Sequence, residues 1–212
     1  MVAVCAARGH RPVALLRGPE HLDRVRALGG EPVLMDAGRD PRALRAALAG
    51  VLDGADALVL AAGTGGGGRS SGTGADRSPA RLFAAAGEQA GVRRYVMVSN
   101  WHGAEEQPWS REEKAGYLEA KAAAEDDVRA RDLDWTVVRT GRLTDAPADG
   151  LVHLGVATGS TAPRGRIGRA DVAAAVVALL DRRASFGRTL ELTEGEQSLA
   201  GAIESLFGTV ED

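Results

Sequence analysis

The sequence predicts an α/β protein in which helices cover both faces of a mainly parallel sheet. Short apolar runs flanked by turn residues alternate with helical patterns along nearly the whole chain, which is the order expected of βαβ units. The apolar runs are continuous rather than alternating, as in strands buried on both faces. With 212 residues and a hydrophobic content of 44%, the chain can form a single domain over residues 1–212.

Each expected strand is a short run of mostly aliphatic residues. We expect strands at 11–17, 31–36, 56–63, 94–100, 134–141 and 188–195. We expect helices at 19–28, 41–53, 78–90, 110–131, 169–182 and 197–207. Two helix starts are marked: Ser110 and Glu113 form a capping box, and Ser78 precedes Pro79 at a first helical position. Ligands of such a sheet bind beyond the carboxyl ends of its strands.

Composition limits the classes of partner. The net charge is -3 and the pI is about 5.9, so no basic excess exists for a nucleic acid or an anionic membrane. Cys5 is the only cysteine, which excludes an intramolecular disulfide, and no Cys and His cluster has zinc-ligand spacing. The first apolar run meets Arg8 too early for a signal peptide, and no later run has membrane-spanning length. We expect a cytoplasmic protein.

The segment GYLEAKAAAE places Tyr117 four residues before Lys121 in an alanine-rich helical stretch. Lys114 is the only other lysine and Tyr95 the only other tyrosine. A spacing of four puts both side chains on one helix face. An ammonium near the phenol lowers its pKa by about 1 to 3 units from ~10, which makes tyrosine a usable general acid. The alternative is two solvated side chains on an exposed helix.

The Gly- and Ser-rich segment 63–76 matches G-x-G-x-x-G at Gly63, Gly65 and Gly68. A phosphate-binding loop needs a helix directly after its glycines, so that the helix N-terminus faces the anion. The next expected helix begins about ten residues later. We therefore favour a mobile loop and keep the phosphate loop as an alternative.

Several segments in their order along the chain resemble one family. They are ARGHRPVALLRGPE, LAAG, AGVRRYVMVSN, YLEAKAAAED, LDWTVVRTGRLTD and IGRADVAAAVVALLD. Together they resemble the atypical short-chain dehydrogenase/reductases, specifically the small NAD(P)-binding group that includes NmrA-like and biliverdin-reductase-B-like proteins. The resemblance covers nearly all of the chain. It implies a Rossmann-like, doubly wound sheet, a nicotinamide cofactor and reduction of a carbonyl or related small substrate.

By position, the resemblance makes Ser99, Tyr117 and Lys121 the catalytic candidates. Tyr117 would protonate the developing alkoxide, Ser99 would hold the oxygen, and Lys121 would tune the phenol and hold the ribose. A serine at a strand end is also a common turn residue or helix cap.

The cofactor-binding candidates come from the same resemblance. They are Arg17, Asp36, Ala61, Ala62, Gly63, Lys121, Arg139 and Thr140. Arg17 ends the strand at which an arginine pairs with the 2′-phosphate of NADP, whereas an acid there binds the ribose of NAD. We therefore favour NADP(H) over NAD(H). The stretch RTG at 139–141 departs from the family's Arg-Pro-Gly, and the loss of proline is expected to loosen this loop.

The front of the chain departs most from the family, whose members begin with a strand, a glycine-rich turn and the start of a helix. The opening MVAVCAARGH resembles only the end of that helix. The missing part, about fifteen residues at ordinary strand and loop lengths, includes the pyrophosphate-binding turn and a central first strand. The expected strands at 11–17 and 56–63 would each lose a partner. We expect a start upstream of Met1, closure of the gap by these two strands, or another segment in the gap.

The sequence therefore predicts an NAD(P)H-dependent oxidoreductase that acts on a small-molecule substrate as a monomer or homodimer, without a metal. The region at about 144–168 is expected to cover the substrate pocket and contains no recognisable specificity motif. Two alternatives remain. One is a non-catalytic NAD(P)-binding regulatory or redox-sensing protein, and the other is an N-terminally truncated remnant with impaired cofactor binding.

Overall fold

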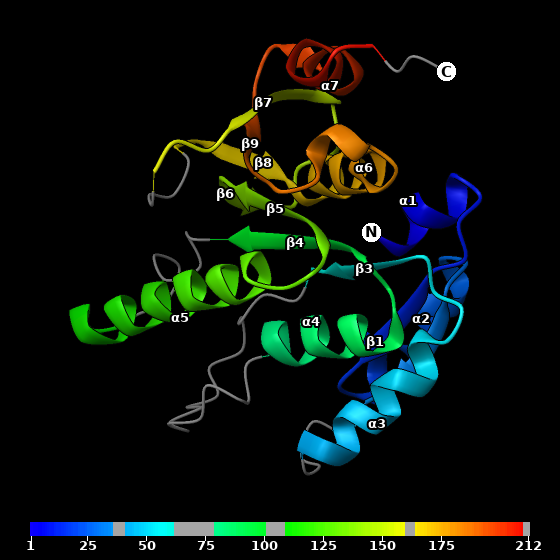
Figure 1. The fold of residues 1–212 in the computed structure, drawn as a ribbon. Coiled ribbons are helices and arrows are strands. Elements are labelled where there is room, and N and C mark those ends of the chain that lie inside the picture. Colours follow the sequence, from blue (N-terminus) through cyan, green and yellow to red (C-terminus); the bar gives the residue numbers. More distant parts are fainter. Residues whose placement is uncertain (36–40, 62–78, 101–108, 160–163, 210–212) are drawn as a thin grey trace.

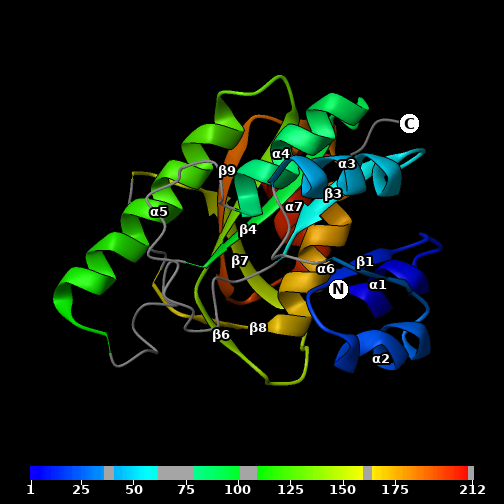
Figure 2. The ribbon, with the colours of Figure 1, turned by 90° about the horizontal axis from the view of Figure 1, so that it is seen from below.

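The computed structural model describes residues 1–35, 41–61, 79–100, 109–159 and 164–209. Its helices cover both faces of the sheet, with α4 and α5 on one side of the strands and α6 on the other (Figures 1 and 2). The predicted α/β, Rossmann-like class is confirmed.

The strands have the following bounds: β1 Val13–Leu16, β2 Glu31–Leu34, β3 Ala57–Leu60, β4 Arg94–Asn100, β5 Asp134–Thr140, β6 Arg142–Thr144, β7 Leu151–Val156, β8 Arg166–Gly168, β9 Arg188–Glu194 and β10 Gln197–Ser198. The α-helices are α1 Val2–Ala7, α2 Leu22–Ala27, α3 Pro41–Leu52, α4 Pro79–Ala90, α5 Arg111–Arg129, α6 Arg169–Leu180 and α7 Leu199–Phe207, with 3-10 turns at Pro19–His21 and Arg183–Ser185.

A six-stranded sheet in the order β10-β7-β9-β5-β4-β3 forms the centre of the molecule. Strands β3, β4, β5 and β9 are parallel, and β7 is antiparallel to both β9 and β10. All six predicted strands are present. The sequence interpretation did not include β7, because its side chains alternate between buried and exposed as in a strand with one solvated face, whereas continuous apolar runs were the signal used.

The sheet is divided next to β3. Strand β1 pairs with β2 in a separate two-stranded sheet, and β3 pairs with β4. Among the residues that the structure describes, no strand lies against the other edge of β1 or of β3. The expectation that these two strands each lack a partner is therefore confirmed, and they do not close the gap by pairing with each other.

Side chains of β4 point alternately to two cores, as the two-residue period of a strand requires. Tyr95 and Met97 belong to the core under α4 and α5, whereas Val96 and Val98 face the core under α6. The next residue in the first series is Ser99, which therefore lies on the face covered by α5. This placement matters for the site.

Arg94 fastens β4 to the end of α6. Its side chain is 7% exposed and donates to the carbonyl oxygens of Leu179 and Leu180 at 2.6 and 2.7 Å. It also donates to Thr136 Oγ1 at 2.9 Å and lies 4.6 Å over the Phe186 ring. Because burial disfavours the charged form, the pKa of Arg94 falls to about 10. A cation at the last carbonyls of a helix also interacts favourably with the negative end of the helix dipole.

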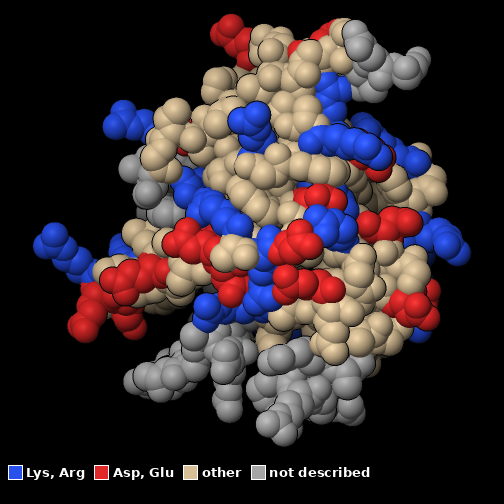
Figure 3. Space-filling view, viewed as in Figure 1, with Lys and Arg blue, Asp and Glu red and all other residues tan. Residues whose placement is uncertain are grey.

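The surface carries both signs of charge, and acidic and basic side chains are interspersed over the face seen in Figure 3. None of the helices in the described ranges is both long and apolar enough to cross a bilayer. Within the same ranges, no group of three or more His, Cys, Asp or Glu side chains is arranged to hold a metal ion.

Candidate active site

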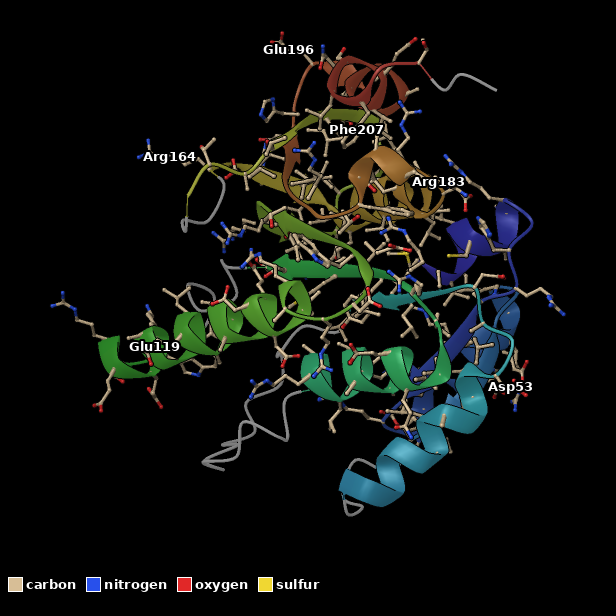
Figure 4. All side chains as sticks on the ribbon, in the orientation of Figure 1. Asp53, Glu119, Arg164, Arg183, Glu196 and Phe207 are labelled. Carbon is tan, nitrogen blue, oxygen red and sulfur yellow. The ribbon has the colours of Figure 1, made fainter. Side chains whose placement is uncertain are left out.

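Helix α5 presents Tyr117 and Lys121 toward the sheet. The predicted capping box fixes its start, because Ser110 Oγ accepts from the Glu113 N–H at 3.2 Å and Glu113 Oε2 accepts from the Ser110 N–H at 2.7 Å. Tyr117 and Lys121 are four residues apart, about one helical turn, and therefore share a face of α5. Glu119, between the two in sequence, points away from the body of the protein (Figure 4).

Tyr117 joins α5 to the carboxyl end of β4. Its hydroxyl donates to the carbonyl oxygen of Asn100 at 2.8 Å, and its ring lies 5.4 Å from the ring of Trp109 at an angle of 53°. The phenol is only partly buried. The hydroxyl is thus held at the end of a central parallel strand, where ligands of this fold class bind.

Lys121 is buried beside the tyrosine. Its side chain is 6% exposed, and Nζ lies 5.7 Å from the centre of the Tyr117 ring. Burial lowers the pKa of Lys121, and the negative charge of Glu125 partly opposes this effect. The interpretation of two solvated side chains therefore does not fit Lys121.

Ser99 lies fully buried on the α5 face of β4, next to Arg139 on β5 in the sheet register. Arg139 is 4% exposed and pairs through Nη2 with Glu125 Oε2 at 2.7 Å. Its Nη1 donates to the carbonyl oxygen of Gly159 at 2.6 Å. The Arg139 guanidinium, for which the family resemblance predicted cofactor binding, is thus directed at Glu125 on α5.

Glu125 is the residue that sequence reasoning missed. It is fully buried and also binds Arg129 Nη2 at 2.7 Å. It follows Lys121 by one turn, so the helix carries phenol, ammonium and carboxylate at successive turns on one face. An acid within the apolar face of YLEAKAAAED was the available signal. Two arginines neutralise this carboxylate, and the third cation near it is Lys121.

Thr140 ends β5 opposite Asn100. Its hydroxyl is buried and has no hydrogen-bond partner among the described residues. Burying such a group without a partner costs about 1–3 kcal/mol, so an unsatisfied hydroxyl at a strand end marks a place where a ligand group can bind. This observation fits a cofactor across the ends of β4 and β5.

The remaining cofactor candidates lie elsewhere or are not described. Arg17 follows β1 and Ala61 follows β3, both with exposed side chains. Asp36, Ala62 and Gly63 lie outside the described residues, as do Ser78 and the rest of the glycine-rich segment. The structure therefore brings together Ser99, Tyr117, Lys121, Arg139 and Thr140, with Arg17 at the carboxyl end of a separate strand.

A mainly parallel sheet with helices on both faces, and polar side chains gathered at the carboxyl ends of its central strands, is the architecture of the dinucleotide-binding proteins. A model of the NAD(P)H-binding family matches residues 1–183. The chain belongs to this family, within the atypical short-chain dehydrogenase/reductases. The resemblance found in the sequence is confirmed.

Two proteins are similar to this one over nearly the whole chain. The "uncharacterized sugar epimerase" YhfK of Bacillus subtilis is 32% identical over 204 residues, which cover 93% of this chain and 88% of YhfK. A solved putative NAD-dependent epimerase/dehydratase from Bacillus halodurans is 28% identical, with a TM-score of 0.76 and coverage of 97% of this chain and 92% of that one.

A more distant likeness concerns the fold alone. A short-chain dehydrogenase/reductase from Veillonella parvula, solved in complex with NADP, is 16% identical with a TM-score of 0.63. The match covers 91% of this chain and 88% of that one.

Proposed function

We propose that this chain is an NAD(P)H-dependent oxidoreductase that reduces a carbonyl or related group of a small substrate. The observation that carries the proposal is the pairing of Tyr117 with Lys121, whose buried ammonium lies 5.7 Å from the phenol ring. A nicotinamide cofactor, when bound, supplies the hydride for such a reduction.

In this proposal, the protein residues handle the proton and the developing charge. The substrate oxygen replaces the Asn100 carbonyl as the acceptor of the Tyr117 hydroxyl, and the phenolic proton moves to that oxygen as it becomes an alkoxide. The Lys121 ammonium stabilises the phenolate left behind. Ser99 donates a hydrogen bond to the same oxygen. Thr140, whose hydroxyl lacks a partner in the described part of the chain, binds the cofactor from β5.

We also propose that NADP(H) is preferred over NAD(H). Arg17 is exposed at the carboxyl end of β1, and a guanidinium there can form a bidentate pair with the 2′-phosphate. The NADP complex of the V. parvula protein, which has a similar fold, supports this choice.

Sugar epimerisation is a second candidate, because YhfK is called a sugar epimerase and the Bacillus halodurans protein an epimerase/dehydratase. The same tyrosine would move protons in both reactions. A reductase consumes one NADPH for each product formed, whereas an epimerase returns its cofactor unchanged. A regulatory protein would bind the cofactor and turn over neither class of substrate.

The test measures NADPH consumption with a panel of aldehydes, ketones and quinones, and interconversion of nucleotide sugars in parallel. With saturating NADPH, Tyr117→Phe should lower turnover about 10²-fold or more. Tyr95→Phe is the matched control, because Tyr95 is fully buried away from the site and its hydroxyl donates to Ala80 O at 3.3 Å. Bound cofactor without turnover of any substrate would favour the regulatory alternative and contradict the proposal.

A further inference from the structure

We propose that Arg139 is a positioning residue, which holds residues 157–159 against the helix that carries Tyr117 and Lys121 and thereby fixes one border of the substrate site. Residues 157–159 follow β7 and are called the β7 exit segment below. The proposal rests on the proposed oxidoreductase function and adds a residue to it. Three observations carry it: the face of the sheet on which Arg139 lies, the partners of its guanidinium, and the course of the chain around these partners.

Arg139 lies on the face of the sheet that α5 covers. Val137, two residues before it on β5, belongs to the core under α4 and α5, and side chains two residues apart on a strand share a face. The neighbour of Arg139 on β4 in the sheet register is Ser99, on the same face. The Arg139 side chain therefore leaves the sheet directly beside a residue of the proposed site.

The guanidinium of Arg139 joins two parts of the chain that are distant in sequence. Nε and Nη2 donate to Glu125 Oε2 at 3.1 and 2.7 Å, and Nη1 donates to the carbonyl oxygen of Gly159 at 2.6 Å. Glu125 lies one turn after Lys121 on α5. Because the donors of arginine form a planar fork, they can bind in both directions at once. One side chain thus connects α5 with the β7 exit segment.

The same partners favour a positioning role of Arg139 over cofactor binding. Its side chain is 4% exposed, and the carboxylate of Glu125 beside it is fully buried. A phosphate group would have to replace this carboxylate as the partner of the guanidinium, and breaking a buried ion pair is strongly unfavourable. The charge of Arg139 therefore serves Glu125, and its remaining donors serve the β7 exit segment.

The β7 exit segment is bound at two points that are both joined to α5. The Ala157 N–H donates to the carbonyl oxygen of Thr189 on β9 at 2.9 Å, and the Thr189 hydroxyl accepts from Arg129 Nη2 on α5 at 3.1 Å. Gly159 has a φ of +97°, a conformation that favours glycine, and is bound by Arg139. The segment therefore runs from β9 to the guanidinium beside the proposed site.

The chain that returns to β8 is also bound near the end of β5. The carbonyl oxygen of Gly165 accepts from the Arg142 N–H at 2.9 Å, and a Cβ added to Gly141 would meet that carbonyl oxygen at 2.7 Å. The carboxyl ends of such strands are where ligands of this fold class bind. Of the two carbonyl contacts, the one to Gly159 comes from a side chain, so a substitution can remove it.

Loss of the Gly159 contact should affect substrate binding more than the chemical step. Tyr117 and Lys121 remain on α5, which Ala124 and Val128 anchor in the core. The β7 exit segment would lose its attachment beside the site. A change that raises KM and leaves kcat unchanged removes binding that the ground state and the transition state share, and this is the result expected for a border of the substrate site.

The test compares Arg139→Met and Arg139→Lys with the wild type. Methionine removes every donor and leaves Glu125 paired with Arg129 at 2.7 Å. Lysine keeps the charge beside Glu125, which preserves the test if the methionine variant does not fold, but a single ammonium does not reproduce the fork.

Kinetics use saturating NADPH and the best substrate of the aldehyde, ketone and quinone panel. Both variants should raise KM about tenfold or more and keep kcat within about threefold of the wild type. The affinity for NADPH, measured by titration, should stay within about twofold, because the proposal gives the guanidinium no cofactor contact.

Amide exchange followed by NMR reports the β7 exit segment without any turnover. The Ala157 N–H should exchange about tenfold faster or more in both variants, because its hydrogen bond to β9 then lies next to an unattached stretch of chain. The amides of His153 and Gly155 are internal controls, because these residues lie earlier in the ladder of β7 and β9. They should change by less than about twofold.

Arg166→Lys is the matched control variant. Arg166 on β8 also pairs with a glutamate, through Nε to Glu194 Oε2 at 3.0 Å, but both side chains are exposed. This replacement should change neither KM nor the exchange of Ala157 by more than about twofold.

Several results would overturn the proposal. A loss of NADPH affinity in the Arg139 variants would assign the guanidinium to the cofactor, and a lower kcat with unchanged KM would place its effect at Tyr117. A wild-type KM in Arg139→Lys would show that the charge alone is sufficient. Wild-type exchange at Ala157 in both variants would show that the β7 exit segment does not depend on Arg139.

Failure of the proposed function would be visible separately. It would appear as the absence of turnover of every panel substrate by the wild type. The exchange of Ala157 would then still decide whether Arg139 holds the β7 exit segment, because this readout needs neither substrate nor cofactor.

Discussion

The hydroxyl of Tyr117 donates to the carbonyl oxygen of Asn100 at 2.8 Å, which joins α5 to the end of β4, a central strand of the sheet. The hydroxyl is directed at the part of the sheet where Thr140 has a buried hydroxyl without a partner among the described residues. A substrate oxygen would have to compete with a main-chain carbonyl for this donor. Lys121 and Glu125 lie on the same face of α5 as Tyr117, so the proposed general acid stands in a row with a buried ammonium and a buried carboxylate.

Replacing Arg17 by Ala should weaken NADPH more than NADH. The difference should be about 1.5–3 kcal/mol, the range for a hydrogen bond to a charged group. Parallel titrations with both cofactors measure it. Arg11→Ala is the matched control, an exposed arginine before the amino end of β1, which should weaken both cofactors little. Equal losses of NADPH and NADH affinity in Arg17→Ala would remove the argument for NADP.

Lys121→Met should change the pH dependence of stability. Burial lowers the folded-state pKa of Lys121, so between this pKa and the ordinary value of about 10.4 the unfolded chain binds more protons than the folded chain. Lysine then makes the free energy of unfolding rise with pH across that window. Denaturant titrations at several pH values should show this rise in the wild type and a smaller one in Lys121→Met.

Lys114→Met provides the comparison for that experiment, because Lys114 is the only other lysine of the chain. It should leave the pH profile of the wild type nearly unchanged. A Lys121→Met profile that runs parallel to the wild type at every pH would mean that the lysine stays fully solvated, against the observed burial.

Much of this arrangement could be predicted from the sequence. The continuous apolar runs located all six predicted strands, and the spacing of Tyr117 and Lys121 placed them on one face of a helix that Ser110 and Glu113 begin. These features are local, because they depend on periodicity and capping within one element. The lost pairing partner of β1 and β3 was also predictable, since the family order of segments shows which strand lies between them.

Contacts between elements could not be predicted in the same way. Arg139 and Glu125 lie 14 residues apart on β5 and α5, and only the packing of helix on sheet shows that the arginine binds this carboxylate. The resemblance suggested a cofactor role for Arg139 because it considered the motif alone.

Glu125→Gln should destabilise the fold strongly. Removal of one member of a buried ion pair leaves its partners uncompensated and costs about 3–5 kcal/mol, and here Arg139 and Arg129 both lose a carboxylate. Asp126→Asn is the matched control, because this neighbouring acid also binds Arg129, at 2.8 Å, but is exposed. An exposed pair contributes about 0–1 kcal/mol. Chemical denaturation compares the two variants, and similar small losses would show that Glu125 is not the centre of the network.

Arg94→Lys tests whether a buried arginine holds β4 to α6 through carbonyl groups. The guanidinium donates to Leu179 O, Leu180 O and Thr136 Oγ1 simultaneously, a geometry that the single ammonium of lysine cannot reproduce. Lysine keeps the positive charge, so a decrease in the free energy of unfolding would report the loss of the guanidinium hydrogen bonds and not the loss of charge. We expect a decrease of about 3 kcal/mol in the free energy of unfolding, because hydrogen bonds to charged groups contribute about 1.5–3 kcal/mol each and some are retained.

The adjacent Arg93→Lys is the control: Arg93 is exposed and pairs with Asp132 at 2.8 Å, so its replacement should cost less than about 1 kcal/mol. Equal effects of the two variants in urea denaturation would show that the carbonyl contacts of Arg94 add nothing beyond a surface pair.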